Sequence, residues 1–293
     1  MGNSKYEHRV VLFLDILGFK NIVDESVVND EIAARIHTAL HQIHLEYSDQ
    51  TDSDQTDSFD DDTKLTFFSD SLFLTQKFHT CEYTDVYLFL NTAAFIMNSF
   101  LAYGLFPRGA ITHGQCLHEK VQNNHSKARI DTSICYGPAI NNAYIAEETK
   151  AIWPRIIVDP EVLINGIRND KNNNCGDSAE YFGELVKNDG TVFYLDTLRP
   201  DNCDQDKFIP FIKKVRKQVI QNLKKQTDNH IREKYELFAD YFNSKVEELN
   251  LGEGDDSIPD SLIRPDEENF NKVKRLFEEV NKNRVVSNPS SPK

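Results

Sequence analysis

Two aspartates stand where the chain is expected to change direction, and both have the chemistry of a metal ligand. Asp15 follows the apolar run HRVVLFL at 8–14, which has the length and composition of a buried strand. Asp70 lies between two β-rich runs in KLTFFSDSLFLTQ at 64–76, a pattern that predicts a hairpin with the aspartate in its turn. Carboxylate oxygens suit Mg²⁺ or Mn²⁺, with substrate phosphates completing the coordination shell.

The predicted order of elements explains how these two aspartates could meet. Up to residue 160 the chain alternates between strands and helices: a strand at 8–14, an amphipathic segment from 19, a helix at 30–47, the hairpin at 64–76, a helix at 83–102, a strand at 107–115, a helix at 136–152 and a strand at 154–159. This order, β, α, α, β-hairpin, α, β, α, β, is that of a ferredoxin-like, palm-type α+β fold.

In such a sheet the first strand runs antiparallel beside the second strand of the hairpin. The end of the first strand then meets the hairpin turn, so Asp15 and Asp70 converge although 55 positions separate them (70 − 15). Two ions held there could activate an attacking oxygen and stabilise a leaving one. Taken singly, Asp15 could instead cap the following helix and Asp70 could be an ordinary turn aspartate. The combination, with apolar strands on both sides, favours metal binding.

The rest of the chain divides into polar loops and a helical C-terminal part. The acidic segment 48–62 and the polar segment 119–131 are predicted to be loops, and 160–203 is mixed, with a strand at 191–196. Charged helical segments then follow at 205–226, 230–250 and 266–282. We therefore expect a catalytic domain over 1–203 and a helical extension with a tail over 204–293. An apolar helical stripe in the first of these helices should pack on the catalytic domain or on a partner subunit: Phe208, Phe211, Ile212, Val215, Val219 and Leu223.

Composition limits the classes of function. The 293 residues include 47 acidic and 33 basic side chains, for a net charge of −14, which argues against broad nucleic-acid binding. An anionic substrate would need a metal ion or a local basic pocket to offset this charge.

With 39% hydrophobic residues and a mean hydropathy of −0.53, the chain is typical of a soluble protein. No signal peptide and no apolar run of about 18 residues is evident, so no membrane association is expected. Five scattered cysteines without a CxxC pair indicate free thiols in a reducing cytoplasm.

Four segments, taken together, resemble the class III nucleotidyl cyclase domain. They are FLDILGFK, FFSDS, PRGAITHG and GPAINNAYIAEETKAIWPRIIVD, in this order, and the resemblance covers about residues 8–160. It implies that Asp15 and Asp70 bind the metal ions, joined by the backbone carbonyl of Ile16. It also implies that Asn141 orients the ribose in the transition state, and that Gly137 permits the close turn before it.

The chain departs from the family at three positions. Ile145 occupies the position at which members of the family have an arginine that binds the substrate phosphates. Another cation must therefore act there, or stabilisation of the phosphates is weaker. The candidates for this cation are Arg108, Arg155 and Lys64. Thr66 and Ile134 occupy the positions at which purine cyclases read the base, and neither is charged.

The missing purine readers and the added C-terminal helices make the chain look like the Pycsar pyrimidine cyclases of bacterial anti-phage defence. That resemblance implies a substrate of UTP or CTP, a product of cyclic UMP or cyclic CMP, and a separate effector that reads the product. Arg108 and Tyr47 are candidates to bind the smaller base. Alternatively, Arg108 pairs with a surface carboxylate and Tyr47 packs at a helix end.

The implied reaction is attack of the ribose 3′-hydroxyl on the α-phosphorus, with loss of pyrophosphate, at two Mg²⁺ or Mn²⁺ ions per site. Class III sites lie between two catalytic domains, so a chain with one such domain implies a homodimer with two equivalent sites. Three alternatives stay open: a purine cyclase, a diguanylate-cyclase-like palm domain that lacks the Gly-Gly-Asp-Glu-Phe hairpin, and a catalytically weak or dead nucleotide sensor. The preference between UTP and CTP and the activating signal also stay open.

Overall fold

The computed structural model describes residues 6–48, 63–78, 83–123, 130–173, 178–200, 205–251, 257–259 and 262. Its eight strands form one sheet in the order β2-β3-β1-β4-β6-β8-β7, with β5 paired to the outer half of β4. All neighbours are antiparallel except β4 and β6. The strands are β1 (Glu7–Ile16), β2 (Lys64–Phe68), β3 (Ser71–Lys77), β4 (Pro107–Asn123), β5 (Ile130–Tyr136), β6 (Ile156–Val158), β7 (Val186–Asn188) and β8 (Phe193–Leu195).

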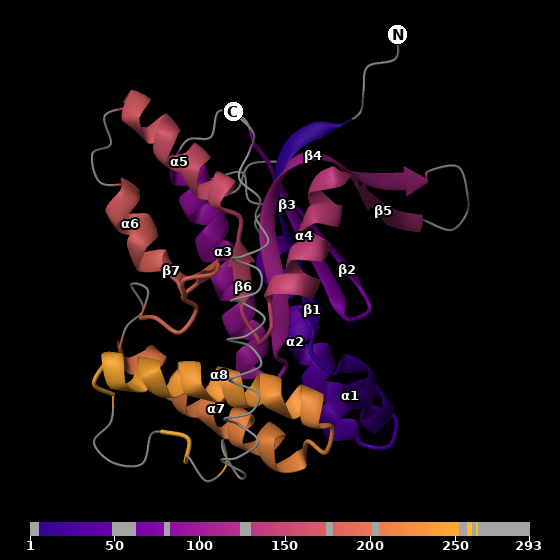
Figure 1. Ribbon diagram of the computed structural model, residues 1–293. Coiled ribbons are helices and arrows are strands. Elements are labelled where there is room, and N and C mark those ends of the chain that lie inside the picture. Colours follow the sequence, from indigo (N-terminus) through magenta and orange to yellow (C-terminus); the bar gives the residue numbers. More distant parts are fainter. Residues whose placement is uncertain are drawn as a thin grey trace, which may run out of the picture.

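Helices cover both faces of this sheet and one of its ends (Figure 1). They are α1 (Phe19–Ser26), α2 (Asp30–Ser48), α3 (Tyr83–Ala102), α4 (Pro138–Lys150), α5 (Pro160–Asn173), α6 (Ser178–Leu185), α7 (Gln205–Lys225) and α8 (Asn229–Glu248). The prediction of an α+β palm-type fold followed by helices is therefore confirmed, with the first strand beside the second strand of the hairpin.

The central strand β1 is buried on both faces, which explains its nearly continuous apolar sequence. Side chains alternate across a strand, so Leu12 and Leu14 join the main core with α3, while Val11 and Phe13 pack with Ala143 of α4 in a second cluster. The strand is thus fixed between two helical layers, and its last residues are held in place at the end of the sheet.

One predicted loop is wrong. Residues 119–131 were expected to be irregular, but β4 continues to Asn123 and pairs with β5 from Ile130 onward. Two antiparallel strands satisfy each other's backbone hydrogen bonds, so such a ribbon can form from polar residues without an apolar face to bury.

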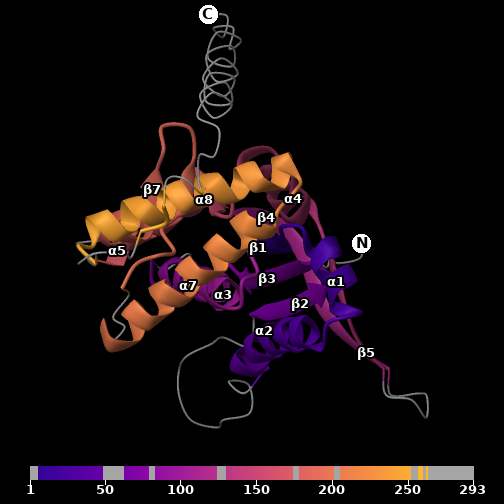
Figure 2. The same ribbon diagram turned by 90° about the horizontal axis from the view of Figure 1, so that it is seen from below.

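The C-terminal helices share the main hydrophobic core with the sheet. The predicted stripe of α7 is buried there at Phe208, Ile212, Val215, Val219 and Leu223, with Phe211 packed against it, which confirms the expected packing on the rest of the chain. Figure 2 shows α7 and α8 crossing beneath the sheet, with the beginning of α8 beside α4. The proposed boundary at 203 stays a prediction, and the predicted helix at 266–282 lies outside the described residues.

Helix α3 is the core helix of this arrangement. Within the described part of the chain, its segment Asp85–Ala102 is the one stretch that is long and apolar enough to cross a membrane, and 56% of that stretch is buried inside the fold. Its apolar side chains are therefore used for packing against the sheet and the neighbouring helices.

Candidate active site

Asp15 and Asp70 are brought together by the register of β1 and β3. Asp15 pairs with Ser71, the first residue after the turn, and the amide N–H of Ile16 donates to the carbonyl oxygen of Asp70 at 3.0 Å. The turn itself contains Ser69 and Asp70, because Phe68 pairs directly with Ser71. Ser69 adopts a left-handed conformation with φ of 56°, which a two-residue hairpin turn requires. The predicted convergence of the two aspartates therefore occurs.

The electrostatics of this pair favour a bound cation. Burial raises the pKa of the Asp15 carboxyl above its usual value, and the negative charge of Asp70 raises it further. The side chain of Asp15 is still 29% exposed, so a ligand can reach it. Two hard carboxylates that repel each other at an accessible position fit Mg²⁺ or Mn²⁺, whose charge would offset this repulsion.

Among the described residues no group of three or more His, Cys, Asp or Glu side chains could enclose a metal ion. A metal at Asp15 and Asp70 would therefore need further oxygen ligands from elsewhere. A backbone carbonyl such as that of Ile16, substrate phosphates and water are the usual sources for Mg²⁺.

A buried ion pair adjoins Asp15 on the side of α4. Arg108 lies opposite Asp15 in the β1–β4 register, and its Nη2 lies 4.0 Å from Asp15 Oδ2 and 2.6 Å from Glu147 Oε1. Its Nη1 donates to the carbonyl of Ala151 at 3.1 Å. The contact with Glu147 is close but lacks hydrogen-bond alignment, since Glu147 Oε1 and Arg108 Nε have no hydrogen-bond partner among the described residues.

Glu147 was not among the predicted site residues. Only 3% of it is exposed, and burial raises the pKa of its carboxyl to about 7, against the opposing effect of Arg108. In sequence it belongs to AEETK, which reads as an ordinary solvated helix end. Its link to the site depends on the contact with Arg108 and on the charge of Asp15, two residues distant in the chain.

A second missed residue comes from the C-terminal part. Lys234 of α8 is half-buried, and its positive charge acts on both Asp15 and Glu147. Burial and the like charge of Arg108 lower the pKa of Lys234, while the two carboxylates raise it. No motif in the sequence connects this helix with Asp15.

The candidate cations named from the sequence have different surroundings. Arg108 lies beside Asp15, as described. Arg155 is buried, its Nη1 donates to Asp189 at 2.6 Å, and its guanidinium stacks 5.0 Å from the Trp153 ring centroid. Lys64 donates from Nζ to the carbonyl of His118 at 2.6 Å. Of the three, Arg108 is the one that the fold places at the aspartate pair.

Helix α4 carries the residues expected to form the other half of a site. Gly137 precedes it with φ of 148°, and a Cβ there would lie 2.6 Å from the carbonyl oxygen of Gln115 and 2.8 Å from Cys116 Cα. The close turn expected at Gly137 is therefore present. Asn141 lies exposed in the first part of the helix, and Ile145 is exposed further along the same helix.

Among the described residues no hydrogen bond or ion pair joins Asn141 to Asp15. Gly137 lies against Gln115, seven residues along β4 from Arg108 (115 − 108), which is about 23 Å of strand. Asn141 then lies six residues before Glu147 (147 − 141), or about 9 Å along the helix axis.

The two expected base positions belong to different surfaces. The hydroxyl of Thr66 forms a hydrogen bond with His118 Nε2 at 2.8 Å, and His118 Nδ1 bonds the Thr75 hydroxyl at 2.9 Å. Ile134 of β5 is exposed and pairs with Glu119, whose side chain points to the opposite face of the ribbon from His118. Tyr47 lies in the last turn of α2, and its side chain is outside the described part of the chain.

A cavity of about 380 Å³ opens between α4 and the strands β4, β6 and β8. Its lining includes Asn142, Ile145 and Lys150 of α4, together with Thr112 and Asp159. The exposed side of α4 that follows Asn141 thus borders a space large enough for a small ligand.

Comparisons with known proteins return structural similarity alone. No protein-family model matches the sequence, and no curated protein matches it. Among solved structures, the guanylyl cyclase Cya2 is 12% identical with a TM-score of 0.42, over 67% of this chain and 93% of that one. A bacterial light-regulated adenylyl cyclase is 11% identical with a TM-score of 0.38, over 72% and 98%.

A third structure is the guanylyl cyclase domain of the RhoGC fusion protein from Blastocladiella emersonii. It is 14% identical with a TM-score of 0.39, over 57% of this chain and 85% of that domain. Identities this low, with scores below 0.5, leave the activity of this chain to be inferred from its own residues.

Proposed function

We propose that the protein is a nucleotidyl cyclase, which converts a nucleoside triphosphate into its 3′,5′-cyclic nucleotide and pyrophosphate. One observation carries this proposal: Asp15 and Asp70 meet at the accessible end of β1, in an arrangement whose charge repulsion a divalent cation would relieve. The sequence resemblance to class III cyclases, at these aspartates and at Asn141, supports the same reaction.

In the proposed reaction, some residues of the site bind metal ions and others position the substrate. Asp15 and Asp70, with the carbonyl of Ile16, would hold two Mg²⁺ or Mn²⁺ ions, which supply activation of the 3′-hydroxyl and neutralise charge on the phosphates. Arg108 lies 4.0 Å from Asp15 and keeps positive charge beside the reacting groups. Because the protein forms no covalent bond in this mechanism, correct positioning accounts for most of the rate enhancement.

Two copies of the chain would complete each site. Asn141 lies on the exposed side of α4, and in the class III pattern that the sequence resembles it belongs to a different half of the site from the aspartates. In a head-to-tail homodimer, the aspartates of one subunit would face Asn141 of the other, giving two equivalent sites.

We propose UTP or CTP as the substrate, because the expected base positions have no charged reader for a purine. Neither Thr66 nor Ile134 can make a charge-assisted contact with a purine edge, and the Thr66 hydroxyl is already bonded to His118. A purine edge that met no polar reader at either position would lose about 1–3 kcal/mol for each hydrogen bond left unmade. The assignment to anti-phage defence, with a separate effector for the cyclic product, rests on the sequence resemblance alone.

A single incubation tests both levels of the proposal. The protein is mixed with equimolar ATP, GTP, CTP and UTP and with Mn²⁺, and the products are separated by chromatography. We expect cyclic UMP or cyclic CMP in clear excess. If the product is mainly cyclic AMP or cyclic GMP, the cyclase assignment holds and the pyrimidine assignment is wrong. Absence of any cyclic product, with nucleotide binding retained, would favour a sensor with a cyclase fold.

A further inference from the structure

Helix α8 closes the end of the sheet at which Asp15 and Asp70 lie. The ring of its Tyr235 packs edge-on against Phe106, with centroids 5.1 Å apart, and the carbonyl of Phe106 accepts from the N–H of Leu17 at 3.0 Å. One turn earlier, Ile231 Cδ1 lies 3.8 Å from the position of a Cβ on Gly18. The first half of α8 is therefore packed on the residues that closely follow Asp15 in the chain.

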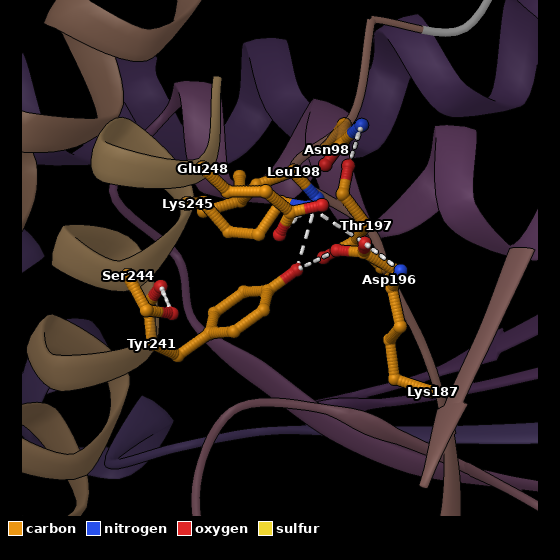
Figure 3. A network of polar contacts seen from close by, with 9 residues as sticks. All are labelled: Asn98, Lys187, Asp196, Thr197, Leu198, Tyr241, Ser244, Lys245 and Glu248. Atoms are coloured by element: carbon orange, nitrogen blue, oxygen red, sulfur yellow. Dashed lines mark hydrogen bonds and ion pairs between the residues drawn. The ribbon is translucent and has the colours of Figure 1, made fainter. Parts of the chain in front are cut away.

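The far half of α8 is fixed by a buried polar network (Figure 3). Lys245 Nζ donates to Asp196 Oδ2 at 2.8 Å, and the hydroxyl of Tyr241 donates to Asp196 Oδ1 at 2.6 Å. Both Asp196 and Lys245 are buried, and the same tyrosine hydroxyl accepts from the N–H of Leu198. With both halves packed, the helix has a defined position relative to the sheet.

Lys234 lies within the first of these anchored parts, between Ile231 and Tyr235. Its ammonium makes no hydrogen bond or ion pair with another described residue, although the charges of Asp15 and Glu147 act on it. Cations that serve only to neutralise buried carboxylates usually pair with them directly, as Arg108 does with Glu147 at 2.6 Å. Lys234 thus keeps its donors available on the part of α8 that packs beside Leu17 and Gly18, near Asp15.

We propose that Lys234 binds the substrate's phosphates in the site of its own chain, as the cation that stands in for the family arginine missing at Ile145. The identity of the ligand rests on the proposed function, since a triphosphate is what the aspartate pair would hold. The C-terminal helices then have a role in the site: they carry a phosphate-binding lysine across the end of the sheet.

Calorimetric titration with pyrophosphate in the presence of Mg²⁺ tests this without turnover. The variants are Lys234→Met, which keeps the side-chain length, Lys234→Arg, which keeps the charge, and Lys213→Met, which removes an exposed lysine of α7 as a matched control. We expect Lys234→Met to weaken pyrophosphate binding about ten- to a hundredfold, since a hydrogen bond to a charged group is lost. Lys234→Arg should recover most of the affinity, and Lys213→Met should bind like the wild type.

The other outcomes separate this inference from the proposed function. If Lys234 is only a counter-ion, Lys234→Met will bind pyrophosphate as well as the wild type does and will bind Mn²⁺ more tightly, which overturns the proposal. Failure of the wild type to bind pyrophosphate also overturns it. Loss of binding in Lys234→Met, in a protein that cyclises none of the four triphosphates, supports the phosphate site and contradicts the cyclase assignment.

Discussion

At the scale of single residues, Asp15 occupies a position that disfavours its own charge. Burial and the neighbouring Asp70 raise the pKa of its carboxyl, so the folded protein without metal gains nothing from ionising it. Residues under such repulsion are common at functional sites, where a ligand supplies the missing opposite charge. The stability of the metal-free protein and its activity should therefore respond in opposite ways to a change at this position.

We predict that Asp15→Asn and Asp70→Asn each abolish Mn²⁺-dependent cyclisation, because an amide cannot replace a carboxylate as a ligand of a hard cation. The metal-free Asp15→Asn protein should unfold at the same temperature as the wild type or a higher one. Turnover by chromatography and thermal unfolding by circular dichroism check the two parts. Substantial turnover in either variant would contradict the two-metal site, and a large loss of stability would show that Asp15 has a structural role.

Glu147 predicts a dependence of stability on pH. Its pKa in the folded protein is raised from 4.5 to about 7, so the ionised form is disfavoured by folding. Such a group contributes fully to stability below its unfolded pKa, and the contribution is lost as pH rises through the folded value. Relative to Glu147→Gln, the metal-free wild type should therefore lose about 1–3 kcal/mol of unfolding free energy between about pH 5 and pH 8.

Urea unfolding of both proteins at several pH values measures this difference. The glutamine side chain keeps the size of the glutamate and removes its titration, so the comparison isolates the carboxyl group. Parallel pH profiles for the two proteins would mean that Glu147 stays ionised throughout, held by Arg108 at 2.6 Å.

At the scale of elements, the network around Asp196 decides how firmly α8 is attached. We predict that Asp196→Asn lowers the unfolding free energy by about 3–5 kcal/mol, because the buried ammonium of Lys245 loses its buried charged partner. The variant should also lose pyrophosphate affinity, since α8 carries Lys234. Glu248→Gln is the matched control: Glu248 contacts the same lysine at 2.8 Å but is 52% exposed, so its loss should cost less than about 1 kcal/mol.

Denaturant unfolding and calorimetry measure these effects. Equal losses of stability in the two variants would show that burial of Asp196 adds nothing. A destabilised Asp196→Asn protein with unchanged pyrophosphate affinity would separate the attachment of α8 from the phosphate site.

The elements that carry the aspartates could be predicted from the sequence because each has a strong local signal. The apolar run before Asp15 is buried on both faces, and the β-rich runs beside Asp70 flank a two-residue turn. The outer half of β4 and all of β5 lack such a signal, because the end of β4 is polar and β5 mixes polar and apolar residues, so their pairing depends on backbone hydrogen bonds.

Glu147 and Lys234 could not be predicted from the sequence for a different reason. Glu147 and Lys234 acquire their role through tertiary contacts, and Lys234 lies 219 positions after Asp15 (234 − 15). A lysine on an amphipathic helix usually faces solvent, and only the attachment of α8 beneath the sheet places this one at the aspartate pair. The separation of Thr66 from Ile134 likewise depends on the strand register of the β4–β5 ribbon.

At the scale of the whole molecule, exposed apolar side chains gather on β5 and α4, next to Asn141. Ile134 and Tyr136 belong to β5, and Tyr144 and Ile145 belong to α4, all four with large exposed fractions. Several exposed apolar side chains on two consecutive elements are typical of a surface that another protein covers. A second copy of the chain on this face would bring its own aspartate pair to Asn141.

We therefore predict that two inactive variants complement each other. Asp15→Ala removes a metal ligand from one half of the site, and Asn141→Ala removes the ribose contact from the other half. In a mixed head-to-tail dimer, one of the two sites combines both lesions and the other contains neither. With free exchange of subunits in an equal mixture, half of the dimers are mixed and each has one intact site. About a quarter of the wild-type activity per chain should then return.

The measurement is turnover of the mixture after co-refolding, compared with each variant alone and with the wild type at the same concentration. Exchange of subunits is checked independently, by mass spectrometry of differently labelled chains. Because Asn141 is exposed on α4 and no hydrogen bond or ion pair among the described residues joins it to Asp15, neither substitution should disturb the other half-site. If labelled heterodimers form and no activity returns, both residues belong to one subunit's site and the head-to-tail dimer is wrong.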